Sequence, residues 1–167
     1  KRTALFIGYH GAHAPVISGI TIRNGRDLKG SGVSIISSSP TLDRCIINPN
    51  GDVQSAGAYE TYKKYYGGGI YIESGNPLIK GCVIAKGYAT YGGGVYLSSS
   101  ASPLFDHCWI LNNCSHTGGA GIEISKGGHL ELADCVIRDN TVANWGGGGI
   151  FAYEGSSLNA QGSLISD

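Results

Sequence analysis

The sequence predicts an all-β fold, wound as a parallel β-solenoid, and three observations lead to this prediction. Glycine is unusually frequent, at 28 of 167 residues, against roughly 7% in average proteins. The glycines fall in short clusters that recur along the chain, and each cluster opens a string of alternating apolar residues. A second string, which in most copies starts at a cysteine, follows some fourteen residues after each cluster.

The first string has plain copies at residues 67–72, 92–97, 118–124 and 146–152, and a weaker copy at 30–35. Alternate positions of a strand face opposite sides of its sheet. Two columns of this string carry small or medium aliphatic side chains, which predicts that they face the core. The columns are Val33, Ile70, Val95, Ile122 and Ile150, and Ile35, Ile72, Leu97, Ile124 and Ala152.

The second string fixes the period of the repeat. Its anchor residues are separated by 25, 37, 26, 27 and 28 positions, and they are Ile20, Cys45, Cys82, Cys108, Cys135 and Ser163. A repeat of this length made of short strands cannot bury its own apolar face, so it stacks on its neighbours about 4.8 Å away. We therefore expect about six coils of roughly 26 residues.

Each coil is expected to turn through one left-handed residue. The fifth position after each anchor is glycine or asparagine, the two residue types that best tolerate a positive φ. The residues concerned are Gly25, Asn50, Gly87, Asn113 and Asn140.

The strings resemble those of a known family. A glycine run followed by Ile or Val and Tyr, and then Cys-Val-Ile-x-x-(Asn/Gly), is similar to the right-handed parallel β-helix repeats of the pectate-lyase-like superfamily. In detail it most resembles the glycine-rich repeats of bacterial surface proteins, such as polymorphic outer-membrane autotransporter passengers. The resemblance covers nearly the whole chain and implies a right-handed parallel β-helix in an extracellular or cell-surface location. It implies no single activity, because the family includes lyases, epimerases, adhesins and inert stalks.

We expect one β-helix segment over residues 1–167. The 37-residue interval contains an insertion, Gly51–Tyr66, where sister coils use four or five residues. Both ends of the sequence fall within a coil, so the expected partners are further β-helix coils at both ends, or other copies of this chain.

The charge balance, the apolar runs and the cysteines argue against several kinds of partner and site. Twelve basic side chains balance twelve acidic ones, which argues against nucleic acid as a partner. The apolar runs are too short for membrane insertion. The four anchor cysteines form one inward column, interpreted as a ladder of reduced core residues. We expect no metal site and no cofactor.

Aromatic residues predict a binding edge. The insertion places three tyrosines at helical spacing beside two lysines, and the matching turns of later coils add further rings. Such rings suit stacking on sugars, and lysines suit pairing with acidic saccharides; alternatively, the tyrosines cover an apolar flank. The predicted binding residues are Tyr59, Tyr62, Lys63, Lys64, Tyr66, Tyr88, Tyr91 and Trp145.

Two outward columns are unusually apolar for solvated strand faces, and such a strip typically marks a contact surface. One column runs Phe6, Ser34, Tyr71, Tyr96, Glu123 and Phe151. The other is the predicted lateral interface, and apart from Thr21 it consists of Ile46, Val83, Trp109, Val136 and Leu164. The insertion is long enough to cover one of the two columns.

A charged cluster precedes the anchors. In a polysaccharide lyase a basic side chain removes a proton and a cation such as Ca²⁺ neutralises the substrate carboxylate. The residues that could form such a site are Lys80, Asp106, His107 and Asp134, with Asp43 as a further calcium ligand and Arg44 as an alternative base. Alternating charges on a stacked surface also arise from structural pairing alone.

The sequence therefore favours a non-catalytic extracellular scaffold, structural or adhesive, that forms part of a larger surface protein or filament and contacts a polysaccharide through its aromatic edge. The alternative is a fragment of a lyase or epimerase acting on acidic polysaccharide.

Overall fold

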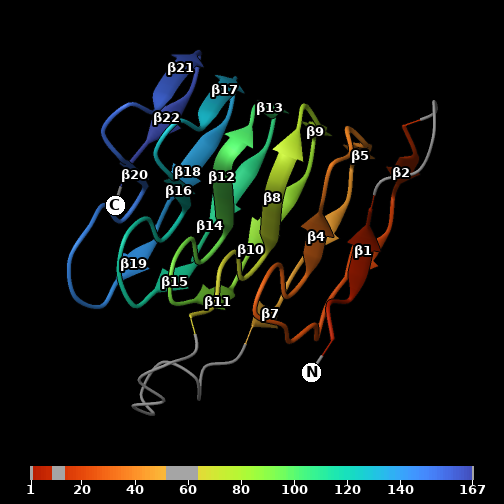
Figure 1. Ribbon diagram of the computed structural model, residues 1–167, viewed down its shortest axis with the longest axis horizontal. Coiled ribbons are helices and arrows are strands. Elements are labelled where there is room, and N and C mark those ends of the chain that lie inside the picture. Colours follow the sequence, from red (N-terminus) through yellow and green to blue (C-terminus); the bar gives the residue numbers. More distant parts are fainter. Residues whose placement is uncertain (1, 9–13, 52–63, 167) are drawn as a thin grey trace.

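The computed structural model describes residues 2–8, 14–51 and 64–166, and the statements below concern those residues. They form strands and turns that wind as a solenoid, in which equivalent strands of successive coils lie side by side along the rod (Figure 1). The described part contains no helix long and apolar enough to cross a membrane. The all-β solenoid predicted from the sequence is thus confirmed.

The glycine-led strings form the first sheet, which has six parallel strands: β1 (Leu5–Ile7), β4 (Val33–Ile35), β8 (Ile70–Gly75), β12 (Val95–Ala101), β16 (Ile122–Ile124) and β20 (Ile150–Ala152). The second strings form another six-stranded sheet, called here the third sheet because it comes third along each coil. Its strands are β3 (Thr21–Ile22), β6 (Ile46–Ile47), β10 (Val83–Ala85), β14 (Trp109–Leu111), β18 (Val136–Arg138) and β22 (Leu164–Ile165).

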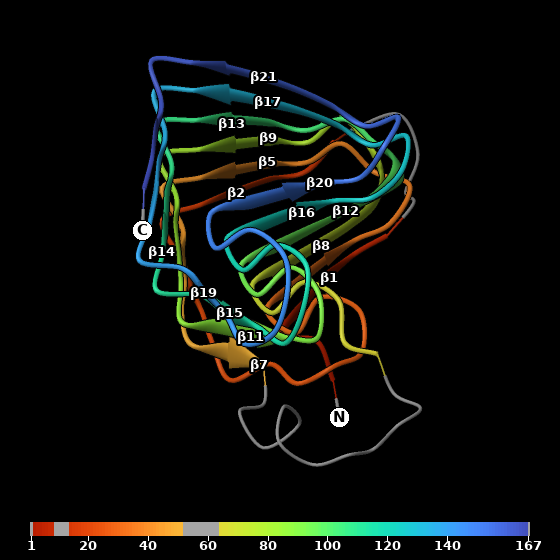
Figure 2. The ribbon, with the colours of Figure 1, turned by 90° about the vertical axis from the view of Figure 1, so that its left-hand side faces the viewer.

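Two further sheets complete each coil, and Figure 2 shows the four as the sides of the cross-section. The second sheet, which the repeat strings did not reveal, contains β2 (Val16–Ser18), β5 (Thr41–Asp43), β9 (Leu78–Lys80), β13 (Leu104–Asp106), β17 (His129–Ala133) and β21 (Ser157–Gln161). The fourth sheet is short and contains β7 (Asn50–Gly51), β11 (Gly87–Ala89), β15 (Cys114–Ser115) and β19 (Thr141–Val142).

Strand register follows the repeat. Val95 pairs with Ile70 on one side and with Ile122 on the other, so like residues stack on like. The predicted inward columns are buried in the middle coils, where they meet Phe105 and Ile79 of the second sheet. The chain completes five turns between β1 and β20 and then continues through β21 and β22, close to the expected six coils.

The cysteine ladder lies in the core. All four anchor cysteines are buried and carry free thiols. Val83 pairs with Trp109, which makes the preceding residues, Cys82 and Cys108, vertical neighbours. Each thiol also has a backbone acceptor, as where Cys108 Sγ lies 3.1 Å from the carbonyl oxygen of Ile79. The prediction that the anchor cysteines form one buried column in the core is confirmed.

The left-handed position was predicted wrongly. The positive φ values fall one residue earlier, at Asn24, Lys86, Asn112 and Asp139, and also directly before the anchors, at Gly19, Arg44, Gly81, His107, Asp134 and Gly162. The asparagines at the predicted positions are buried and form a hydrogen-bonded ladder instead. Asn113 accepts from the N–H of Gly87 at 2.8 Å and donates to the carbonyl of Ile84 at 3.1 Å.

Candidate functional site

An aromatic pocket lies against the outer face of the first sheet. It has a volume of about 230 Å³ and is lined by Lys64, Tyr66, Tyr91, Tyr96, Glu123, Ser125, Lys126 and Tyr153. Four successive coils contribute these residues, so the pocket exists only because the coils stack in register. Pockets for drug-sized ligands span roughly 300–1,000 Å³, and this smaller space fits one ring-sized group.

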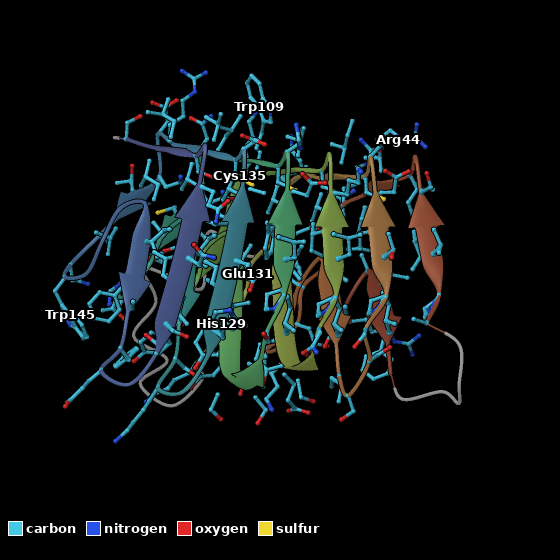
Figure 3. All side chains as sticks on the ribbon, turned by 90° about the horizontal axis from the view of Figure 1, so that it is seen from above. Arg44, Trp109, His129, Glu131, Cys135 and Trp145 are labelled. Carbon is cyan, nitrogen blue, oxygen red and sulfur yellow. The ribbon has the colours of Figure 1, made fainter. Side chains whose placement is uncertain are left out.

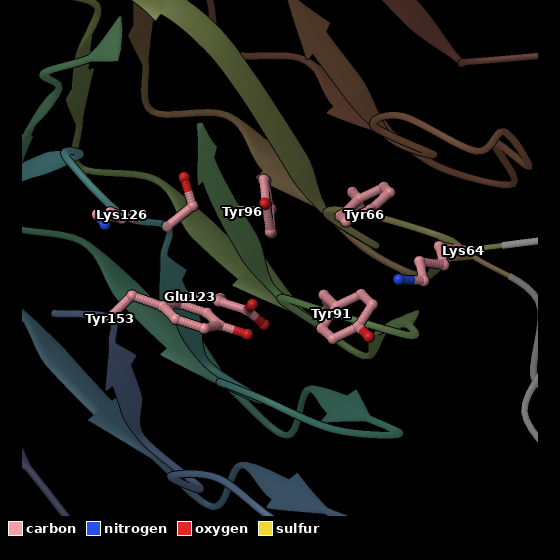
Figure 4. A pocket seen from close by; sticks show the side chains of 8 residues that line it. Lys64, Tyr66, Tyr91, Tyr96, Glu123, Lys126 and Tyr153 are labelled. Carbon is pink, nitrogen blue, oxygen red and sulfur yellow. The ribbon is translucent and has the colours of Figure 1, made fainter. Parts of the chain in front are cut away.

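The tyrosine rings pack against each other. Tyr66 and Tyr91 occupy equivalent positions of adjacent coils, and their rings stack with centroids 5.4 Å apart. Tyr66 also meets Tyr96 edge-on at 4.8 Å, and Lys64 lies over the ring of Tyr91 at 5.7 Å. Figure 4 shows these side chains together around the pocket. The packed rings form a preorganised wall for stacking.

Glu123 lies at the base of this wall, with a relative exposure of 1%. Burial raises the pKa of its carboxyl group to about 7, against the opposing effect of backbone N–H donors. One donor is the N–H of Gly119, 3.3 Å from Oε2. Burial also raises the pKa of Tyr96 to about 12. A buried carboxyl group in a pocket, with a pKa shifted by desolvation, is typical of functional sites.

The predicted binding edge is assembled in part. Lys64, Tyr66 and Tyr91 line the pocket. Tyr88 lies apart in the fourth sheet, paired with Gly51 and Cys114, and Trp145 is exposed and packs edge-on against Phe151 at 5.5 Å. Tyr59, Tyr62 and Lys63 belong to residues 52–63, which lie outside the described residues.

The predicted lateral strip runs along the outer face of the third sheet. In-register pairing aligns Ile46, Val83, Trp109, Val136 and Leu164. Trp109 is 49% exposed and projects from the rod (Figure 3); Ile46 and Leu164 are exposed as well, whereas Val83 and Val136 are half-buried. The other outward column is largely covered, since Ser34, Tyr71 and Glu123 are buried.

The charged cluster meets at the corner between the second and third sheets. Lys80 Nζ lies 3.5 Å from Asp106 Oδ2, the other oxygen of Asp106 contacts His107 Nδ1, and His107 Nε2 lies 3.8 Å from Asp134 Oδ2. The hydrogen bond between His107 and Asp106 raises the pKa of the histidine and lowers that of the carboxyl group. The four residues are thus brought together, but in a chain of ion pairs.

This chain of ion pairs does not fit the calcium site of the lyase alternative. Lys80 stands in register between Asp43 and Asp106, so an ammonium group separates those two carboxylates. Over residues 2–8, 14–51 and 64–166, no group of three or more histidine, cysteine or acidic side chains is placed to hold a metal ion.

Comparison with known families agrees with the geometry. A family described as "right handed beta helix region" matches residues 4–167. The chain belongs to this right-handed β-helix family. Searches of curated proteins and of solved structures gave no match.

Within this β-helix, sequence reasoning missed several pocket residues. Tyr96 and Glu123 were assigned to an outward column, and Ser125, Lys126 and Tyr153 received no role. The repeat itself held one signal: Glu123 is the acidic residue in a column whose neighbouring coils carry Tyr96 and Phe151. The repeat strings did not reveal the second sheet. The sequence therefore could not predict where the turns next to the first sheet lie.

Proposed function

We propose that this β-helix is a non-catalytic extracellular scaffold that contacts a saccharide through its aromatic pocket. The observation that carries the proposal is the gathering of four tyrosine rings and two lysines, from four successive coils, around one ring-sized space. Tyrosine faces stack on sugar rings, and lysine pairs with acidic groups on a saccharide. A rigid rod with such a pocket suits an adhesive or structural role.

The setting of the scaffold belongs to the same proposal. The likeness of the GGG-(Ile/Val)-Tyr strings to glycine-rich repeats of bacterial surface and autotransporter-type proteins supports a place at the cell surface, as a segment of a larger surface protein or filament. The outermost strands of the six-stranded sheets pair on one side, and such edges suit further β-helix coils or a second copy of this chain.

Saccharide binding is tested by screening the purified chain on a panel of neutral and acidic oligosaccharides, followed by calorimetry on those retained. Tyr91→Ala and Tyr96→Ala are each expected to weaken binding about tenfold, which corresponds to about 1.4 kcal/mol. Trp109→Ala, on the third sheet, is the matched control and should leave affinity unchanged. Absence of binding across the panel would contradict the proposal.

The second candidate is a lyase or epimerase fragment, and the observation that favours it is that Asp106 contacts both Lys80 and His107. An assay for polysaccharide cleavage distinguishes the lyase from the non-catalytic scaffold. A lyase releases unsaturated uronides that absorb in the ultraviolet, and Lys80→Ala would abolish that release. We expect no such product from the wild type with any acidic polysaccharide; its appearance would replace the scaffold proposal.

A further inference from the structure

From Tyr71 to Phe151, the outward column of the first sheet is aromatic except at one coil. Tyr71, Tyr96, Glu123 and Phe151 are aligned by strand register. The rings of Tyr71 and Tyr96 stack with centroids 5.7 Å apart, nearly parallel at 11°. At the next coil Glu123 takes the place of a ring. The column therefore lacks one aromatic ring, and the pocket lies where that ring would stand.

The turn beside Glu123 keeps this space open. Gly118 has a φ of +75°, and a Cβ added to it would lie 2.0 Å from Oε2 of Glu123. Without that Cβ the carboxyl group can lie against the turn, where it accepts from the N–H of Gly119. The carboxyl group then lines the pocket, and Figure 4 shows it beside Tyr153.

Two lysines flank the pocket that this carboxyl group lines. Lys64 precedes β8 at the end of the insertion and Lys126 follows β16, and Figure 4 shows them on opposite sides of the pocket. The remaining titratable groups lining it among the described residues are Tyr66, Tyr91, Tyr96 and Tyr153. Among the groups that line the pocket, Glu123 is the one whose pKa burial brings to about 7.

The charge of Glu123 decides whether an anion fits. With the carboxyl group protonated, the pocket presents two ammonium groups and a hydroxyl donor. With it ionised, a buried negative charge faces the ligand at close range, where repulsion is weakly screened. A pKa of about 7 places this change within the physiological range.

We propose that the missing rung at Glu123 is a proton-gated site for one sugar ring that carries a carboxylate. The ring stacks on Tyr96, its carboxylate pairs with the flanking lysines, and Glu123 takes up a proton when the ligand binds. This inference rests on the saccharide binding proposed above and adds the ligand charge and the pH at which it is accepted.

The test compares two trisaccharides by calorimetry at pH 5.5 and pH 8.5, one ending in glucuronate and the other in glucose. The glucuronate ligand should bind the wild type about thirtyfold more weakly at pH 8.5, because binding must then protonate a group with a pKa of about 7. The glucose ligand should bind equally at both pH values. This comparison uses the wild type alone and does not depend on a variant folding.

Three variants assign the effect to the missing rung. Glu123→Gln should bind glucuronate equally at both pH values, and Glu123→Phe, which fills the rung with a ring, should bind neither ligand. Glu131→Gln removes an exposed carboxylate on the second sheet and should keep the wild-type pH dependence. Circular dichroism establishes that each variant is folded.

The outcomes distinguish the inference from the function on which it rests. If neither trisaccharide bound the wild type at either pH, saccharide binding itself would be contradicted. If glucuronate bound equally at both pH values, or if Glu123→Phe bound like the wild type, proton gating at this rung would be wrong while saccharide binding stood.

Discussion

At the residue scale, Glu123 makes the stability of the fold depend on pH. In the folded chain its pKa is about 7, against an ordinary value of 4.5. As the pH rises from 4.5 to 7, the unfolded chain releases this proton while the folded chain retains it. The free energy of unfolding therefore falls over that interval, by about 3 kcal/mol at about 1.4 kcal/mol per pH unit.

Urea denaturation at pH 4 and pH 8 measures this contribution. Between those pH values the wild type should lose about 3 kcal/mol relative to Glu123→Gln, whose side chain cannot ionise. The exposed-site variant Glu131→Gln should follow the wild type. Equal pH dependence in the wild type and Glu123→Gln would show that the carboxyl group is not buried as described.

The repeat predicted the column of Glu123 but not its burial. The alternation of the first string places residue 123 on the outer face correctly, and an outward glutamate is ordinarily solvated. Its carboxyl group instead lies against Gly118 and Gly119, in a pocket whose lining includes Tyr66 and Tyr91 from the turns of other coils. Their approach depends on the three-dimensional course of the turns, which the alternation of single strings does not contain.

At the scale of elements, the turn after the third sheet combines two different requirements in adjacent residues. Asn112 adopts a φ of +53° and is exposed, whereas Asn113 is buried and bridges Gly87 and Ile84. Asparagine suits residue 112 because it tolerates a left-handed φ. It suits residue 113 because its side-chain amide both donates and accepts hydrogen bonds. Residue type alone led to the prediction of a left-handed φ at Asn113, whereas its role is the buried hydrogen bonding.

Glycine substitution separates the two roles. Asn113→Gly leaves a buried N–H and a buried carbonyl unpaired and should lower the free energy of unfolding by about 2–3 kcal/mol. Asn112→Gly retains the left-handed turn and should change it by less than about 0.5 kcal/mol. Urea denaturation measures both. Equal tolerance of glycine at the two positions would restore the sequence-based assignment.

At the scale of the whole molecule, the outer face of the third sheet remains a predicted lateral contact. Its strip aligns along the rod as the repeat predicted, with Trp109 half exposed near its centre. The sequence could predict this strip because register alone determines it. The sequence of a single chain does not predict which molecule would bind this strip.

Sedimentation equilibrium tests the contact between copies. The average mass of the wild type should rise with concentration, and Trp109→Lys should weaken self-association at least about tenfold, because a charge then replaces an apolar contact. Trp145→Lys changes a similarly exposed tryptophan away from the strip and should behave as the wild type. Wild-type-like self-association of Trp109→Lys would exclude this face as the contact.

The central claim is that successive coils stack in register, and a spin-label distance tests it most directly. Residues 41 and 159 belong to one column of the second sheet, linked through Leu78, Leu104 and Glu131. Four steps of about 4.8 Å predict a narrow distribution near 19 Å, apart from the label linkers. A broad distribution, or one centred well beyond 30 Å, would contradict the stacked solenoid.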